Sequence, residues 1–186
     1  MATIQREWTV GEVRALPDDG QRYEVVDGAL LVSPSPRLLH QEAVGELLAR
    51  IKAYLAGARA GYAFAAPADI TFGPRTLVQP DLFVAPPIGG RRPREWVDIT
   101  TLLLTVEVLS PATARADRTV KRTLYQRMAV PEYWIVDLQA RRVERWRPQA
   151  KRAEIVDGTL SWLPSAELPP LELHLPTFFA GVWDDR

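Results

Sequence analysis

The first half of the chain alternates between the apolar spacing of strands and that of a helix. Two β-rich runs, 22–26 and 29–32, flank Asp27-Gly28, a dipeptide that is typical of two-residue hairpin turns. After a Ser-Pro-Ser-Pro segment, apolar residues at 44, 47, 48, 51 and 55 follow the i, i+3, i+4, i+7 spacing of one buried helical stripe. The pattern predicts a hairpin that is followed by a helix over about 37–55.

Prolines interrupt the two apolar runs that come next. We expect one strand over 62–72, which contains Pro67, and another over 77–85, which contains Pro80. Because proline has no N–H for a strand ladder, Pro80 favours an edge position or the start of a strand. Residues 86–98 are rich in Pro, Gly and Arg, which predicts a loop.

The most continuous apolar run, 102–109, reads as a central strand that is buried on both faces. A helix that Thr113 caps follows it, and 132–138 reads as a second buried strand. A strand, a helix and a strand in this order predict a parallel pair with a right-handed crossover. Further strands are expected over 142–146, 153–156 and 159–162, the last two around a second Asp-Gly turn, before a proline-spaced tail.

These elements predict one α/β (α+β) domain over residues 1–186, with a mixed β-sheet flanked by helices and β-hairpins towards both ends. We place its core at about 20–147 and a C-terminal hairpin with the tail at 148–186. The chain contains no cysteine, which excludes disulfides and a thiol nucleophile. No apolar stretch approaches the roughly 20 residues that span a bilayer, and the first ten residues do not resemble a signal peptide. We therefore expect a cytoplasmic protein without membrane contact.

Charge narrows the class of partner. The 23 Lys and Arg residues balance 23 Asp and Glu residues, which argues against a protein that mainly coats nucleic acid. An enzyme with a local basic rim is still compatible with this balance, and scattered solvated charge is the alternative. The candidates for such a rim lie in the loop and on the later helix: Arg91, Arg92, Arg94, Arg115, Arg118, Arg122 and Arg127.

Two acidic residues stand in predicted strands. Glu107 interrupts the apolar run 102–109, and a buried glutamate needs a counter-charge. Asp81 follows Pro80 at the head of another apolar segment. Mg²⁺ prefers oxygen ligands and keeps several waters, so two carboxylates suffice to hold it. The alternatives are a structural salt bridge from Glu107 to an arginine and a surface position for Asp81.

Lys121 lies on the helix after Glu107 and is one of only three lysines, with Lys52 and Lys151. Beside a metal site, an ammonium can orient water or stabilise charge on a phosphate. It shares a stripe at i, i+4, i+8 with Asp117 and Tyr125, and the alternative is a solvated helix lysine. His40, one turn before Val44, is either catalytic or a hydrogen-bonded histidine at the edge of the core. Glycine-rich phosphate loops, serine-hydrolase elbows and the His-Glu-x-x-His zinc motif are absent from the sequence.

Several short motifs, taken in their order along the chain, indicate a resemblance to a known family. They are Tyr23 to Gly28, His40-Gln41, Val78 to Asp81, Val106 to Pro111, the Asp117, Lys121 and Tyr125 stripe, and Val130 to Asp137. Together they cover about residues 20–147 and resemble the Uma-two family, whose members are described as restriction endonucleases within the PD-(D/E)xK nuclease superfamily.

The resemblance implies a restriction-endonuclease-like fold and cleavage of nucleic acid with a divalent metal. In the general signature the lysine lies two residues after the glutamate, where this chain has Leu109. The resemblance implies that Lys121 takes its place. It also implies that Glu24 is a further ligand of the metal site, and a hairpin carboxylate paired with Arg22 is the alternative.

We therefore expect a metal-dependent endonuclease that hydrolyses phosphodiester bonds in nucleic acid, DNA in the first place. Asp81 and Glu107 would hold Mg²⁺ or Mn²⁺, Lys121 would position or activate water, and Glu24 and His40 would assist. Aromatic residues around Tyr133-Trp134 and the tail could serve a homodimer. Two alternatives stay open: a catalytically inactive binding or assembly module on the same fold, and a hydrolase of small phosphorylated substrates.

Overall fold

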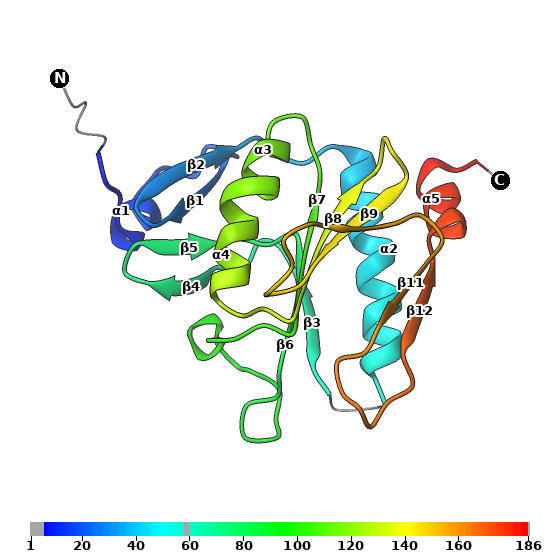
Figure 1. The fold of residues 1–186 in the computed structure, drawn as a ribbon. Helices are drawn as coiled ribbons and strands as arrows, with labels where there is room; N and C mark the ends of the chain where they lie inside the picture. The colour runs from blue at the N-terminus through cyan, green and yellow to red at the C-terminus, as the bar shows by residue number, and fades with distance from the viewer. Residues whose placement is uncertain (1–5, 58–59, 186) are drawn as a thin grey trace.

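A mixed six-stranded sheet forms the centre of the molecule (Figure 1). The computed structural model describes residues 6–57 and 60–185, so the first five residues of the chain lie outside the described part. The strand order is β10 (Glu154–Val156), β9 (Arg142–Trp146), β8 (Glu132–Asp137), β7 (Leu104–Val108), β6 (Leu82–Ala85) and β3 (Tyr62–Ala65). β7 and β8 are parallel, and the other neighbouring strands of this sheet are antiparallel. The predicted parallel pair is thus confirmed, with β7 fully buried.

Two smaller sheets accompany the central one. The N-terminal hairpin belongs to a sheet in the order β2 (Ala29–Ser33), β1 (Arg22–Val26), β5 (Thr76–Val78) and β4 (Ile70–Gly73). A short helix, α1 (Val10–Arg14), begins at a capping box between Thr9 and Glu12 and packs on this sheet. Towards the C-terminus, β11 (Thr159–Trp162) pairs with β12 (Leu171–His174).

Two of the predicted strands are each divided between sheets. The run 62–72 forms β3 and β4, and the run 77–85 forms β5 and β6. The expectation of two continuous strands was wrong because Pro67 and Pro80 have no N–H to continue a ladder. At each proline the chain passes between the small and the central sheet. Asp81 therefore stands where the chain re-enters the central sheet.

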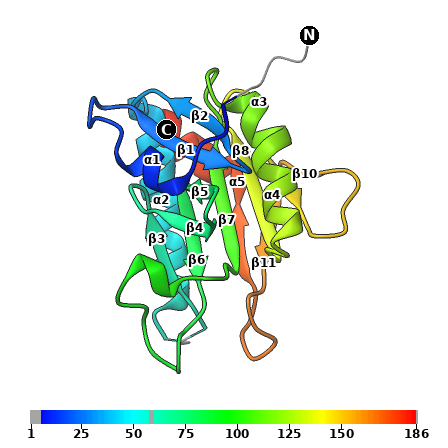
Figure 2. The ribbon, with the colours of Figure 1, turned by 90° about the vertical axis from the view of Figure 1, so that its left-hand side faces the viewer.

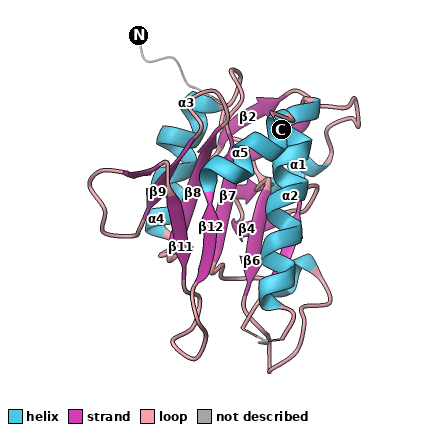
Figure 3. Ribbon diagram, turned by 90° about the vertical axis from the view of Figure 1, so that its right-hand side faces the viewer, coloured by secondary structure: helices cyan, strands magenta, loops and turns pink. Residues whose placement is uncertain are grey.

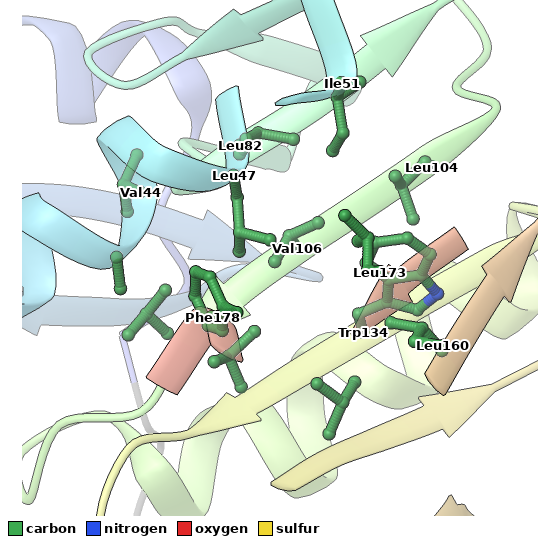
Figure 4. Close-up of a cluster of buried hydrophobic side chains, with 14 of the residues drawn as sticks. Val44, Leu47, Ile51, Leu82, Leu104, Val106, Trp134, Leu160, Leu173 and Phe178 are labelled. Atoms are coloured by element: carbon green, nitrogen blue, oxygen red, sulfur yellow. The ribbon is translucent and has the colours of Figure 1, made fainter. Parts of the chain in front are cut away.

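Helices cover both faces of the central sheet, as Figure 2 shows for α2 (Leu38–Leu55) and α4 (Arg122–Arg127). The predicted helix over 37–55 is confirmed by α2, which packs beside α5 (Leu175–Trp183) on one face (Figure 3). Residues of β6 alternate between the faces: Leu82 and Val84 join the α2 side, and Phe83 joins the α4 side. Figure 4 shows the largest of the three hydrophobic clusters of the described residues, where α2, the central strands, β11, β12 and α5 meet.

The C-terminal region differs from expectation in two ways. The strands on either side of Asp157-Gly158 do not pair with each other, since β10 joins β9 and β11 joins β12. The tail forms a helix, α5, that buries Phe178 and Phe179. Tyr133 and Trp134 are 1% and 0% exposed, so the expectation that they serve a dimer surface was wrong: both fill the core of the protomer.

The helix after β7 is not a regular α-helix. It consists of α3 (Ala114–Ala116), a turn with the wide spacing of a π-helix (Asp117–Lys121) and then α4. A further short 3₁₀ helix, η1 (Trp96–Asp98), lies in the loop before β7. None of the helices in the described part of the chain is long and apolar enough to cross a membrane.

Gly61 gives a test of this packing. A Cβ atom at this position would lie 2.8 Å from a methyl of Val84 and 3.2 Å from the carbonyl oxygen of Ala85. We expect Gly61→Ala to destabilise the fold by about 1–3 kcal/mol, because the backbone of β3 must move away from β6. Urea unfolding measures this change, and Gly45→Ala, where a Cβ meets nothing within 4 Å, is the matched control.

Candidate active site

Neighbouring strand ends bring Asp81 and Glu107 together. In the antiparallel pair of β6 and β7, Leu82 lies opposite Val106, and the same register continued by one residue sets Asp81 opposite Glu107. The two residues are 4% and 2% exposed. Both line one cleft of about 610 Å³, together with Lys121 and His40. The structure thus gathers these four predicted site residues at one end of the sheet.

Lys121 is buried among carboxylates. Its Nζ atom lies 2.8 Å from Glu24 and 3.0 Å from Glu107. The Oδ1 atom of Asp117 lies farther from Nζ, at 3.7 Å. Burial lowers the pKa of Lys121, but the charges of these three acids outweigh burial and leave the pKa raised. Lys121 is therefore a permanently charged ammonium, and the alternative of a solvated helix lysine is wrong.

Asp81 is fixed as a carboxylate. Arg22 donates a hydrogen bond to Oδ1 at 2.7 Å, and Oδ2 accepts bonds from the Val108 N–H at 2.9 Å and from His40 Nε2 at 3.0 Å. Burial raises the pKa of Asp81, but His40 and Arg22 together more than offset this and hold the pKa well below its usual range. The alternative of a surface aspartate is thus wrong, and His40 acts on this carboxylate.

The pKa of Glu107 is shifted in the opposite direction to that of Asp81. Its Oε1 accepts hydrogen bonds from Lys121 at 3.0 Å and from the Tyr125 hydroxyl at 3.2 Å. Burial raises the pKa of Glu107 well above its usual value, the nearby charges of Asp81 and Asp117 add to this, and Lys121 opposes it. Its ion-pair partner is a lysine, so the alternative of a bridge to an arginine is wrong. Among the described residues, Oε2 of Glu107 has no hydrogen-bond partner and is free to accept a ligand.

Glu24 reaches the site from β1 in the small sheet. Besides Lys121, it accepts a hydrogen bond at 2.7 Å from the backbone N–H of Gln79. The alternative that paired Glu24 with Arg22 is wrong, because Arg22 binds Asp81. Arg22 was not expected at the site. The alternation of strand residues was a usable signal, since Arg22 and Glu24 are two apart and so share one face of β1.

Asp117 and Tyr125 complete the cluster, and their stripe with Lys121 already indicated both residues. The stripe faces inward because the wide turn at Asp117–Lys121 directs both of its charged ends into the protein. The Tyr133 hydroxyl also donates a hydrogen bond to the backbone carbonyl of Asp117 at 3.0 Å. Wide turns of this kind occur frequently at functional sites.

The charges of the cluster suit a divalent cation. Four buried acids face the cations Arg22 and Lys121, so the cluster has an excess of two negative charges when all four acids are ionised. These acids are Glu24, Asp81, Glu107 and Asp117. Within residues 6–57 and 60–185, no group of three or more His, Cys, Asp or Glu side chains is placed to hold a metal on its own. Two carboxylates with water and phosphate oxygens as the remaining ligands fit the habits of Mg²⁺.

Three of the arginines that were candidates for a basic rim lie away from the site. Arg91, Arg92 and Arg94 lie in the loop between β6 and β7, at the end of the central sheet opposite to α3 (Figures 1 and 2), so for these three the alternative of scattered charge holds. The reason is strand direction, since the acids stand where β6 begins and β7 ends. Arg118 does line the cleft, but acidic side chains of β8 and β9 hold its guanidinium.

The buried Asp117 predicts a pH dependence of stability. Burial raises its pKa from an ordinary 3.8 to about 6. Between these values the unfolded chain loses a proton that the folded protein keeps, so stability falls as pH rises from about 4 to about 6. Asparagine cannot titrate, so Asp117→Asn should gain about 2–3 kcal/mol relative to the wild type between pH 4 and pH 8. Urea unfolding of both proteins at several pH values measures this, and a constant difference would contradict it.

Comparison with known proteins agrees with this fold. The model of the Uma2 family, described as "Putative restriction endonuclease", matches residues 10–177. The chain is also similar in structure to a protein from Anabaena variabilis ATCC 29413 that is described as "a putative nuclease belonging to DUF820". The TM-score is 0.75 at 22% sequence identity, over 94% of this chain and 99% of the other. At that identity the likeness shows a shared fold.

No curated protein matches the chain. The family match extends over nearly all of the 186 residues and includes Asp81, Glu107 and Lys121. This match shows that the chain belongs to the Uma2 family, which is described as "Putative restriction endonuclease".

Proposed function

We propose that this protein is an endonuclease that uses Mg²⁺ or Mn²⁺ to hydrolyse phosphodiester bonds in nucleic acid, with DNA as its substrate. One observation carries the proposal: Asp81 and Glu107 lie at adjacent strand ends in one cleft, with the Lys121 ammonium on Glu107. Family membership supports the same chemistry. A homodimer, which the cutting of two strands would serve, is part of this proposal.

Glu107 would hold the metal through Oε2, and Asp81 through an oxygen that already accepts hydrogen bonds, since Arg22 bonds its Oδ1 and His40 bonds its Oδ2. Oε2 of Glu107 has no partner among the described residues, and Asp81 is kept ionised by Arg22 and His40. When bound, Mg²⁺ would polarise a phosphate oxygen and lower the pKa of a water molecule next to the phosphorus atom. In this arrangement Arg22 and His40 orient Asp81 rather than touch the substrate.

Lys121 would act through its charge. Its raised pKa keeps the amine protonated near neutral pH, so it is a poor base. An ammonium beside Glu107 can instead stabilise the negative charge that grows on the phosphate oxygens, or donate a hydrogen bond that orients water. Glu24 and Tyr125 hold Lys121 and Glu107 in place.

One observation favours a second candidate, a hydrolase of small phosphorylated substrates. The cleft of about 610 Å³ is within the usual range for small-molecule sites, and most of its lining surface is apolar. Leu38, Leu109 and Leu138 contribute to that lining.

Cleavage assays separate the two candidates. The protein is incubated with plasmid DNA, single-stranded DNA, RNA, mononucleotides and bis(p-nitrophenyl) phosphate, with Mg²⁺, with Mn²⁺ or with EDTA. We expect metal-dependent cuts within the DNA. Hydrolysis of mononucleotides alone would establish the second candidate, and no hydrolysis of any substrate with either metal would refute both.

A further inference from the structure

Asp117 is a buried carboxylate to which the proposed function gives no role. It is 1% exposed, and among the described residues neither of its carboxylate oxygens has a partner at hydrogen-bonding distance and angle, although, against burial, the nearby Thr113 side chain acts to lower its pKa. A buried carboxylate without hydrogen bonds is costly. Its nearest recorded cation, the Nζ atom of Lys121, lies 3.7 Å away, beyond hydrogen-bonding distance.

The Lys121 ammonium has one N–H donor that no carboxylate accepts among the described residues. An ammonium group carries three N–H donors. Two carboxylates, those of Glu24 and Glu107, lie within 3.0 Å of Nζ. The third N–H therefore has no carboxylate within hydrogen-bonding distance among the described residues, and Asp117 is the next acid along. A movement of Nζ by less than about 1 Å would close this gap to an ordinary hydrogen bond.

The backbone keeps the two residues available to each other. Asp117 and Lys121 form the two ends of the wide turn before α4 and are both buried. Tyr133 fixes the first end through the carbonyl oxygen of Asp117. The backbone therefore keeps the Asp117 carboxylate near the Lys121 ammonium, although the two groups do not form a hydrogen bond in this structure.

We propose that Asp117 is a positioning residue that receives the Lys121 ammonium when Glu107 engages the divalent cation. This inference rests on the proposed function. In the metal-free protein, Glu107 shares its charge with Lys121. Once Oε2 of Glu107 holds the cation, Glu107 shares its charge with that cation and attracts Lys121 less strongly, so a further acid is needed to keep the ammonium beside the phosphate. Asp117, with Oδ1 at 3.7 Å from Nζ, supplies that acid.

A purely structural role predicts a different outcome. If Asp117 served only the fold, neutralising it would change stability and nothing else. Our inference instead predicts a variant that is more stable near neutral pH and yet less active. Asp117→Asn keeps the volume of the side chain, and Asp117→Ala provides a second variant if the amide disturbs the fold.

The first readout is the ionisation of Lys121 itself, followed by lysine-selective NMR. The chain has only three lysines, and the exposed Lys52 and Lys151 provide internal references. The charged groups that face Lys121 are Glu24, Glu107 and Asp117. Beside these acids, the Tyr125 hydroxyl bonds Glu107 and the Tyr133 hydroxyl bonds the backbone carbonyl of Asp117.

Without metal, we expect the Lys121 pKa to exceed that of the references in both the wild type and Asp117→Asn. With saturating Mg²⁺ it should stay high in the wild type and fall by about one pH unit or more in the variant. Equal values in the two Mg²⁺-loaded proteins would overturn the inference.

The second readout is kinetic. For Asp117→Asn we expect kcat on DNA to fall by about 10- to 100-fold, and KM and the Kd for Mg²⁺ to stay within about threefold. Glu132→Gln, which neutralises a buried glutamate at the far end of β8, is the control. Unchanged kcat in Asp117→Asn would overturn the role of Asp117 and leave the proposed function standing. If the wild type binds no Mg²⁺, both the proposed function and the role of Asp117 are overturned. If it binds Mg²⁺ but cleaves no substrate, the proposed function is overturned, and the NMR titration still decides on the role of Asp117.

Discussion

Glu107→Gln is expected to abolish metal-dependent cleavage and to leave the protein folded. The amide keeps the volume of Glu107 and can still accept hydrogen bonds from Lys121 and Tyr125, but it offers the cation no charge. We expect a loss of about 10³-fold or more in the cleavage rate. Because burial penalises the charge of Glu107 and raises its pKa, the neutral amide should cost the fold less than a neutral replacement of Asp81, whose charge the fold stabilises.

Asp81→Asn should also lose metal-dependent cleavage, and it should lower the stability of the fold more than Glu107→Gln does. His40 and Arg22 stabilise the charged form of Asp81, so its neutral replacement should destabilise the protein by about 2 kcal/mol near neutral pH. Cleavage rates and urea unfolding together measure this contrast. Glu132→Gln, whose parent is buried and ion-paired with Arg145, is the matched control and should cleave normally. Full activity in either Asp81→Asn or Glu107→Gln would remove that residue from the site.

Lys121→Met has the second largest expected effect, because it harms both the chemistry and the fold. Removal of the ammonium leaves Glu24 and Glu107 without their shared counter-charge, and a buried charge that loses its partner costs about 3–5 kcal/mol. Cleavage should fall by about 10²-fold or more in the fraction that folds. Lys52→Met, on the exposed side of α2, is the control for loss of a lysine.

Lys121→Arg separates charge from geometry. The guanidinium is charged but larger and planar, and it cannot occupy the closed position between Glu24 and Glu107 that a compact ammonium fills. We expect it to fold better than Lys121→Met and still to cleave poorly. Wild-type rates in Lys121→Arg would show that the site needs only a positive charge.

Elements that bury one continuous face were predictable from the sequence. The periodicity of α2 and the apolar runs of β7 and β8 carried enough signal, because each element packs a whole face or both faces into a core. Glu107 stood out for the same reason, as a charge in an otherwise apolar strand. The order of short motifs then identified the family.

Features that depend on distant parts of the chain were not predictable. A run of apolar residues does not reveal that Pro67 and Pro80 mark passages between two sheets. Arg22 and Asp81 are 59 residues apart and meet only because the small sheet docks at the start of β6. The wide turn at Asp117–Lys121, which buries both of its charged ends, could not be predicted from the spacing of the stripe that contains them.

The central claim is that Asp81 and Glu107 share one divalent cation, and calorimetry with Mg²⁺ and Mn²⁺ tests it most directly. The wild type and Glu132→Gln should each bind one equivalent, whereas Asp81→Asn and Glu107→Gln should each lose most of that binding. No binding to the wild type, or equal binding to all four proteins, would contradict the account.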